Sequence, residues 1–224
     1  MIMKPKKIII PAILALGLLP SAAQAANFTD TRGHWAESII NKLADAEVVH
    51  GISDTEFNPG GTVTRAEFLK MAMGVVGIKD VSYRNGECLD VKGTEWYAPC
   101  VQSALDKGLI PEDMIEGYAA KTDENGVLYS GAFNAEKAIK REEMAYIAQA
   151  MYQYSLDEKT YGTLKPSQDL TFSDVRAISI WALDGVRHAY TNGLISGMDD
   201  GNFHPQATAT RAQAATIINN ILDK

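Results

Sequence analysis

The amino-acid sequence predicts a mainly α-helical protein built from three helix-loop-helix repeats. Two observations support this: one order of residues recurs three times, and the apolar residues in each copy follow the period of an α-helix. Each copy has an aspartate a few residues before a tryptophan, and then a phenylalanine eight residues before an arginine. The copies contain Asp30, Trp35, Phe57 and Arg65; Asp90, Trp96, Phe133 and Arg141; and Asp174, Trp181, Phe203 and Arg211.

The first 25 residues have the pattern of a secretory signal peptide. Three lysines precede the apolar run Ile8–Leu19, and the stretch "SAAQA" ends in a small-x-small pattern at Ala23 and Ala25. A membrane-spanning helix needs roughly 20 apolar residues, and this run is shorter. We therefore expect export with cleavage after Ala25, and no stable membrane span afterwards.

The first repeat, predicted for residues 26–80, consists of two helices around a turn-rich loop. Apolar residues fall at helical spacing after Trp35 and again after Arg65, and glycines and a proline separate the two stretches. A unit of about 50 residues cannot easily bury an apolar stripe alone. The repeats are therefore expected to pack on each other through their helices.

The second repeat, predicted for residues 81–153, contains an inserted loop. The distance from tryptophan to arginine is 30 residues in the first and third copies and 45 in the second. Because the spacings on either side are kept, the extra residues lie within the loop at 111–130, where an insertion costs little entropy. A linker at 154–170 precedes the third repeat at 171–224.

Charge and cysteine content restrict the partners and the environment. The chain has 21 basic residues, of which three lysines leave with the signal peptide, against 28 acidic ones, so the mature net charge is near −10. Nucleic acid is therefore a poor partner. Cys88 and Cys100 are the two cysteines; in an exported protein they could form a disulfide, and the alternative is two small buried thiols.

Several motifs together resemble the S-layer homology (SLH) domain. These are "TRAE" at Thr64–Glu67, "TRAQ" at Thr210–Gln213, the aspartate-then-tryptophan openings, and "GMDDGNFHPQATATRAQ" from Gly197. The resemblance implies a three-pronged spindle, in which three pseudo-symmetric repeats surround a central helical bundle. It also implies a secreted protein on the cell surface or cell wall that binds secondary cell-wall polysaccharide non-covalently in grooves between repeats, often through pyruvate-ketal groups.

The same resemblance suggests which residues bind the ligand. Matching motifs place Arg65 and Arg211 at the acidic group, with Arg141 as a third candidate. The second repeat departs from the pattern, because Lys140 stands where the other copies have threonine. The remaining candidates are the tryptophans Trp35, Trp96 and Trp181, the motif residues Thr64, Glu67, Thr210 and Gln213, and the loop glycines Gly51 and Gly197.

Physical chemistry offers two readings of the arginines. The threonine and the Glu or Gln three residues later have capping-box spacing, which leaves the intervening arginine unexplained. A guanidinium beside exposed N–H groups at a helix start is suited to bind a carboxylate, such as that of a pyruvate ketal. The alternative is a solvated or salt-bridged arginine, and for the tryptophans it is packing in the core.

Enzymatic chemistry is not indicated. The sequence has no "HExxH", no "GxSxG" and no phosphate-binding glycine loop, so we expect neither catalysis, cofactor nor metal. The competing hypothesis is a structural protein of the envelope, acting through protein–protein contact, self-association or peptidoglycan attachment. The inserted loop, with Glu112, Asp113, Glu116, Asp123 and Glu124, is a candidate site for another envelope protein.

Overall fold

The computed structural model describes residues 28–84, 88–117, 121–122, 128–129, 131–156 and 167–224. The expected signal peptide lies outside the described residues, as do most of the tip of the inserted loop and much of the expected linker. We call residues 28–80, 81–156 and 167–224 the first, second and third unit.

The described residues are mainly helical, which confirms the predicted class. The first unit contains η1 (Thr29–Thr31), α1 (Glu37–Asp45) and α2 (Arg65–Val75). The second contains α3 (Ala98–Asp106), η2 (Glu112–Met114), the two-residue strands β1 (Lys121–Thr122) and β2 (Leu128–Tyr129), and α4 (Arg141–Ser155). The third contains η3 (Val175–Ala177), α6 (Ile180–Thr191) and α7 (Arg211–Leu222). Helix α4 thus runs two residues past position 153, where the second repeat was expected to end.

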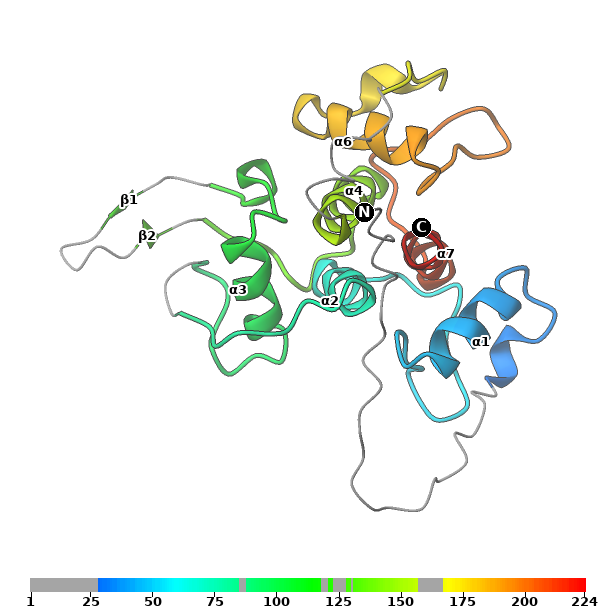
Figure 1. Cartoon of the computed structure of the whole chain (residues 1–224), viewed down its shortest axis with the longest axis horizontal. Helices are drawn as coiled ribbons and strands as arrows, with labels where there is room; N and C mark the ends of the chain where they lie inside the picture. The colour runs from blue at the N-terminus through cyan, green and yellow to red at the C-terminus, as the bar shows by residue number, and fades with distance from the viewer. Residues whose placement is uncertain (1–27, 85–87, 118–120, 123–127, 130, 157–166) are drawn as a thin grey trace, which may run out of the picture.

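Three helices form the centre of the molecule and three lie outside them. Helices α2, α4 and α7 contact one another, and α1, α3 and α6 surround them (Figure 1). Each outer helix packs chiefly on the central helix of the preceding unit: α3 on α2, α6 on α4 and, closing the circle, α1 on α7. Each unit therefore contributes one α-helix to the centre and one to the outer layer, where it packs on another unit.

The segments before the central helices form a closed ring of backbone hydrogen bonds. Val63 N–H donates to the Ala209 carbonyl at 3.2 Å, Ala209 N–H to Ile139 at 3.1 Å, and Ile139 N–H to Val63 at 3.0 Å. All three side chains are buried. Because each segment finds its partner in another unit, the ring requires all three units together, in agreement with the expected packing between repeats.

The repeated aspartates hold the loops between outer and central helices. Asp174 accepts the N–H groups of Phe203 and His204 at 2.8 and 2.7 Å. Asp30 and Asp90 make the same pair of bonds in their units. The phenylalanine of each loop is buried in the core. An aspartate recurs at this position because its carboxylate accepts two N–H groups of the loop backbone.

The structure corrects the expected disulfide. Cys88 and Cys100 are two buried thiols and not a disulfide. The Cys100 thiol lies 3.4 Å from the Met73 sulfur, and burial raises the pKa of this thiol to about 12.

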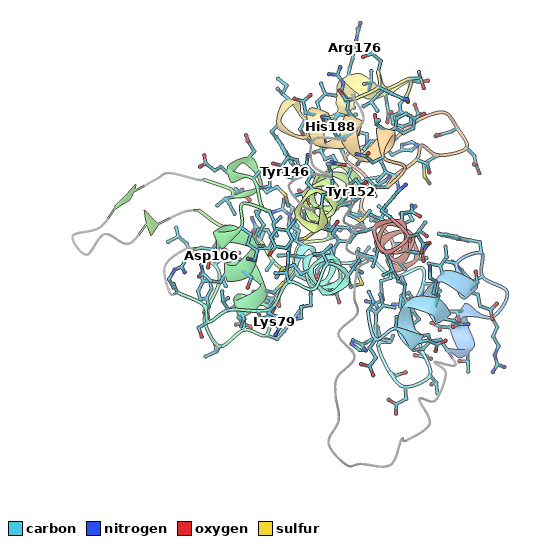
Figure 2. The ribbon with its side chains drawn as sticks, viewed as in Figure 1. Lys79, Asp106, Tyr146, Tyr152, Arg176 and His188 are labelled. Carbon is cyan, nitrogen blue, oxygen red and sulfur yellow. The ribbon has the colours of Figure 1, made fainter. Side chains whose placement is uncertain are left out.

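Figure 2 shows the side chains that lie between the outer and central helices, with Tyr146 of α4 labelled.

None of the helices in the described ranges is both long and apolar enough to cross a membrane.

Candidate ligand grooves

The three repeated arginines begin the three central helices, and the structure buries them. Arg65 is 6% exposed, and Arg141 and Arg211 are each 8% exposed. The expected capping boxes are present: Thr64 and Glu67 bond reciprocally at the start of α2, and Thr210 and Gln213 at the start of α7. In α4 the N–H of Lys140 donates to Glu143 Oε2 at 3.0 Å.

The expectation of exposed N–H groups beside each arginine is wrong. The Arg65 N–H donates to the Lys137 carbonyl at 3.0 Å, and the next N–H, that of Ala66, donates to Ala135 at 2.9 Å. The first two N–H groups of α4 and α7 are bonded in the same way to Ala207 and Pro205, and to Gly61 and Pro59. Carbonyls of neighbouring units thus accept the first two backbone N–H groups of each central helix, so only the side chains remain available to a ligand.

Each guanidinium reaches into the loop of the following unit. Arg141 donates from Nε to the Phe203 carbonyl at 2.8 Å and from Nη2 to the Ser196 carbonyl at 3.2 Å, and its Cζ lies 5.1 Å from the centre of the Phe203 ring. Arg211 repeats this arrangement with Phe57 and His50, with its Cζ 4.6 Å from the Phe57 ring. Burial lowers the pKa of both guanidinium groups from its usual value. Because the hydrogen bonds of Arg141 and Arg211 go to backbone carbonyls, these two arginines are held chiefly by the loop backbone.

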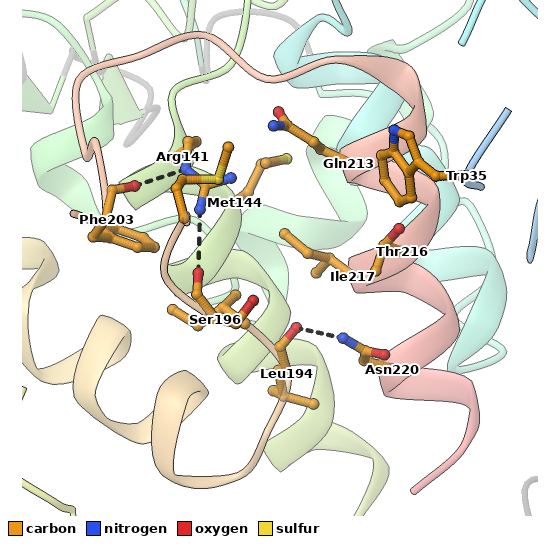
Figure 3. A pocket seen from close by; sticks show the side chains of 12 residues that line it. Trp35, Arg141, Met144, Leu194, Ser196, Phe203, Gln213, Thr216, Ile217 and Asn220 are labelled. Atoms are coloured by element: carbon orange, nitrogen blue, oxygen red, sulfur yellow. Dashed lines mark hydrogen bonds between the residues drawn. The ribbon is translucent and has the colours of Figure 1, made fainter. Parts of the chain in front are cut away.

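The first of the open sites, which we call the Arg141 groove, lies between α7, Trp35 and the loop of the third unit. It is an open-sided cavity of about 220 Å³. Trp35 and Gln213 lie across the cavity from Arg141, and Asn220 donates to the Leu194 carbonyl at its other end, at 3.0 Å (Figure 3). Trp35 is 62% exposed. All three units contribute to this groove.

The second open site, which we call the Arg211 groove, has the same layout one unit further on. Its cavity is about 380 Å³ and lies between α2, Trp96 and the loop of the first unit, including Gly51. Trp96 is 57% exposed. Glu67 lies 3.9 Å from Arg211 Nη1, and Lys70 lines the same wall. This groove therefore contains charges of both signs.

The third site, which we call the Arg65 seam, is filled by the protein itself. Arg65 donates through Nε and Nη2 to the carboxylate of Glu143, and through Nη1 to the carbonyls of Phe133 and Met114. The Trp181 ring lies 5.7 Å from that of Tyr146 and is half-buried against the core. A Cβ at Gly185 would lie 2.7 Å from Tyr146 Cδ2, so this glycine allows α6 to approach α4 closely.

The structure thus places the predicted residues unequally. Trp35 lies in the Arg141 groove and Trp96 in the Arg211 groove, whereas Trp181 packs against the protein. The loop glycines have a packing role: a Cβ at Gly51 would lie 2.5 Å from the Phe28 ring, and one at Gly197 would lie 2.6 Å from the Phe172 ring.

Sequence reasoning missed the position five residues after each arginine. Thr216 and Lys70 line the two open grooves at this position, and Tyr146 fills the seam. Alignment of the three copies contains the signal, because the three residues differ in size and only the lysine is charged. In the part of the chain that the structure describes, no group of three His, Cys, Asp or Glu side chains is placed to hold a metal.

Comparison with known proteins identifies a family and several relatives. The model of the S-layer homology domain family matches residues 27–69 and 171–215. An amylopullulanase of Thermoanaerobacterium thermosulfurigenes is 36% identical over 88% of this chain and 10% of its own length. A surface-layer 125 kDa protein of Lysinibacillus sphaericus is 26% identical over 95% of this chain and 16% of its own. A cellulosome-anchoring protein of Acetivibrio thermocellus is 25% identical over 75% of this chain and 34% of its own.

The chain spans between a tenth and about a third of the length of these relatives. The similarity to the amylopullulanase is confined to a tenth of that protein.

Proposed function

Since this chain carries S-layer homology domains, we propose that it attaches non-covalently to the cell surface by binding an acidic wall polysaccharide in the Arg141 and Arg211 grooves. The relatives named as a surface-layer protein and as a cellulosome-anchoring protein support attachment at the cell surface. The short match to the amylopullulanase supports an anchoring module without catalytic activity of its own. The proposed ligand is a glycan that carries carboxylates, such as a pyruvylated one.

The observation that carries this proposal is the pairing of an exposed tryptophan with a buried guanidinium across one cavity. The flat face of Trp35 suits the apolar face of a sugar ring. Arg141 donates hydrogen bonds from Nε and Nη2 to backbone carbonyls, and within the described part of the chain its Nη1 makes no hydrogen bond. A sugar carboxylate could accept from this nitrogen in a partly desolvated site, where such a bond is strong.

The two open grooves found among the described residues support a binding ratio of two. The Arg141 and Arg211 grooves have the same layout, whereas Glu143 already occupies the guanidinium at the Arg65 seam. We therefore expect two acidic residues of the glycan to be bound per chain. Two sites on one polymer increase the overall avidity well above that of either groove.

A second role is favoured by the inserted loop. Its β1 and β2 strands project away from the central bundle (Figure 1), and Glu112, Asp113 and Glu116 at its base are exposed. We propose that this loop is a contact site for another envelope protein, while the grooves hold the chain on the wall.

The test of the proposed function is calorimetric titration of the mature chain with purified wall polysaccharide, before and after mild acid removal of pyruvate. Binding should require the pyruvate groups. Trp35→Ala and Trp96→Ala should each weaken binding at one groove by about tenfold, the effect of losing about 1.4 kcal/mol of stacking. Ile180→Ala is the control, because Ile180 is 94% exposed and belongs to neither groove.

Equal binding by the depyruvylated polymer, or unchanged binding by both tryptophan variants, would contradict the proposal. Binding of an envelope protein that persists in both tryptophan variants, without any binding of glycan, would instead favour the inserted loop as the functional site.

A further inference from the structure

The third helical residue of each central helix faces the arginine of another central helix. Gln213 of α7 lines the Arg141 groove. Glu67 of α2 lies 3.9 Å from Arg211 Nη1. Glu143 of α4 is bonded directly to Arg65. The same structural position therefore presents a neutral amide, a nearby carboxylate and a bound carboxylate to three equivalent guanidinium groups.

We propose that this position sets the affinity of each site for a carboxylate ligand. The Arg141 groove is the strong site, the Arg211 groove is a weaker one, and the Arg65 seam is closed because Glu143 takes the place of the ligand. This inference rests on the proposed function and adds an order of affinity and the residues that determine it.

The Arg141 groove combines a buried cation with neutral walls. Its lining contains no Asp or Glu, and Arg141 makes no ion pair among the described residues. Asp174 interacts favourably with Arg141, but its carboxylate is bonded to the loop backbone. A ligand carboxylate entering this groove therefore meets a guanidinium that has no ion-pair partner among the described residues, in a partly desolvated site.

The Arg211 groove opposes the same ligand with its own carboxylates. Glu67 and Glu47 both line it, and Glu67 interacts favourably with Arg211. The other cation of this groove, Lys70, is paired with Asp80. A ligand carboxylate must compete with Glu67 and approach two negative groups. Because Glu67 is partly exposed, solvent reduces this penalty to a moderate one.

The Arg65 seam shows the end point of the same series. The side chain of Glu143 is 3% exposed, and it binds two nitrogens of Arg65 in the bidentate manner in which a guanidinium binds carboxylates. The third nitrogen, Nη1, donates to Phe133 and Met114. All three nitrogens of this guanidinium group already donate to the protein, so the seam should not bind a ligand carboxylate.

Exchange of Glu and Gln at this position should leave the fold intact. Thr64 N–H donates to Glu67 Oε2 at 2.8 Å, and Thr210 N–H donates to Gln213 Oε1 at 3.1 Å. Either side chain therefore completes the capping box at the start of its helix. Glu67→Gln and Gln213→Glu each install a residue that the protein already uses at the equivalent position.

The three tryptophans allow each site to be observed separately. The chain has three, one at each site, so the ¹⁵N-labelled mature chain should give three indole N–H signals, assigned with single Trp→Phe variants. The titrant is a monosaccharide with a pyruvate ketal, and its methyl ester, which lacks the negative charge, is the control ligand. The Trp35 signal should shift at the lowest concentration, Trp96 at a higher one, and Trp181 not at all.

The variants test the assigned position directly. Glu67→Gln should lower the midpoint for Trp96 by about two- to fivefold, and Gln213→Glu should raise that for Trp35 by a similar factor, as expected for a partly screened charge pair. Asp184→Asn removes one exposed charge from α6, outside both open grooves, and should change neither midpoint.

Equal midpoints for Trp35 and Trp96 that Glu67→Gln does not change would overturn this inference and leave the proposed function standing. A shift of the Trp181 signal equal to that of Trp35 would overturn the assignment of the closed seam. If no indole signal shifts with the acid form, the proposed function fails, and this inference fails with it.

Discussion

The Arg141 groove and the Arg65 seam are built on the same scaffold, yet one is open and the other is closed. Both have a buried arginine at a helix start, stacked over a buried phenylalanine, and an aspartate that holds the adjoining loop. They differ in the side chains of the helix opposite the arginine: Gln213 and Thr216 in the groove, Glu143 and Tyr146 at the seam. The side chains at two equivalent positions of the central helices thus distinguish the open groove from the filled seam.

Packing of the outer helix reinforces the difference. Contact is most extensive between α6 and α4, the pair at the closed seam. Gly185 faces Tyr146 there, whereas the equivalent position at the Arg211 groove is the larger Cys100, which contacts Met73. The closed seam is therefore a packed interface that stabilises the ring of units, and the open grooves leave part of the same interface available to a ligand.

The largest expected difference between the two sites concerns their arginines. Arg65→Met should reduce the free energy of unfolding by about 3–5 kcal/mol, because it leaves Glu143 buried without its partner. Arg141→Met removes two hydrogen bonds to carbonyls but strands no carboxylate, so the loss should be about 2–3 kcal/mol. Urea denaturation followed by circular dichroism measures both values.

The double variant Arg65→Met/Glu143→Gln tests the cause of that loss. Glutamine retains the bond to the Lys140 N–H and removes the buried charge, so stability should return in part. If the double variant were as unstable as Arg65→Met alone, the stranded carboxylate would not be the reason.

A smaller effect is expected from glycines at a closed and an open site. Gly185→Ala should destabilise the protein by about 1–3 kcal/mol, because the new Cβ would lie 2.7 Å from the Tyr146 ring and 3.2 Å from its Cα. Gly74→Ala, on the wall of the Arg211 groove, is the matched control. A Cβ there meets nothing within 4 Å, so the substitution should stabilise α2 by about 0.5–1 kcal/mol.

Thermal denaturation of both variants provides the comparison. A Gly185→Ala protein as stable as the wild type would mean that close packing of α6 on α4 does not close the seam.

The smallest expected effect concerns reactivity and leaves stability unchanged. Because burial raises the pKa of Cys100 to about 12, this thiol should stay protonated at pH 8 and react slowly with a thiol reagent in the folded protein. In denaturant, protein that has never been exposed to a reductant should show two reactive thiols per chain. A count of zero would restore the disulfide that the sequence suggested.

Sequence reasoning identified the three copies because their marks recur at constant spacing, and it identified the capping boxes because these involve residues three apart. It misjudged the helix starts, because the carbonyls that satisfy the Arg65, Arg141 and Arg211 N–H groups come from a neighbouring unit. It also treated the three tryptophans alike, although Trp181 packs against Tyr146 of another unit.

The sequence by itself therefore determined the helical class, the register of the three copies and the local caps, all of which depend on residues close together in the chain. Only the tertiary structure decided which arginine faces which loop, which groove is open and that the cysteines are separate thiols. The physical reason is that outer and central helices of different units pack together. Each site is thus assembled from residues that spacing along the chain cannot bring into contact.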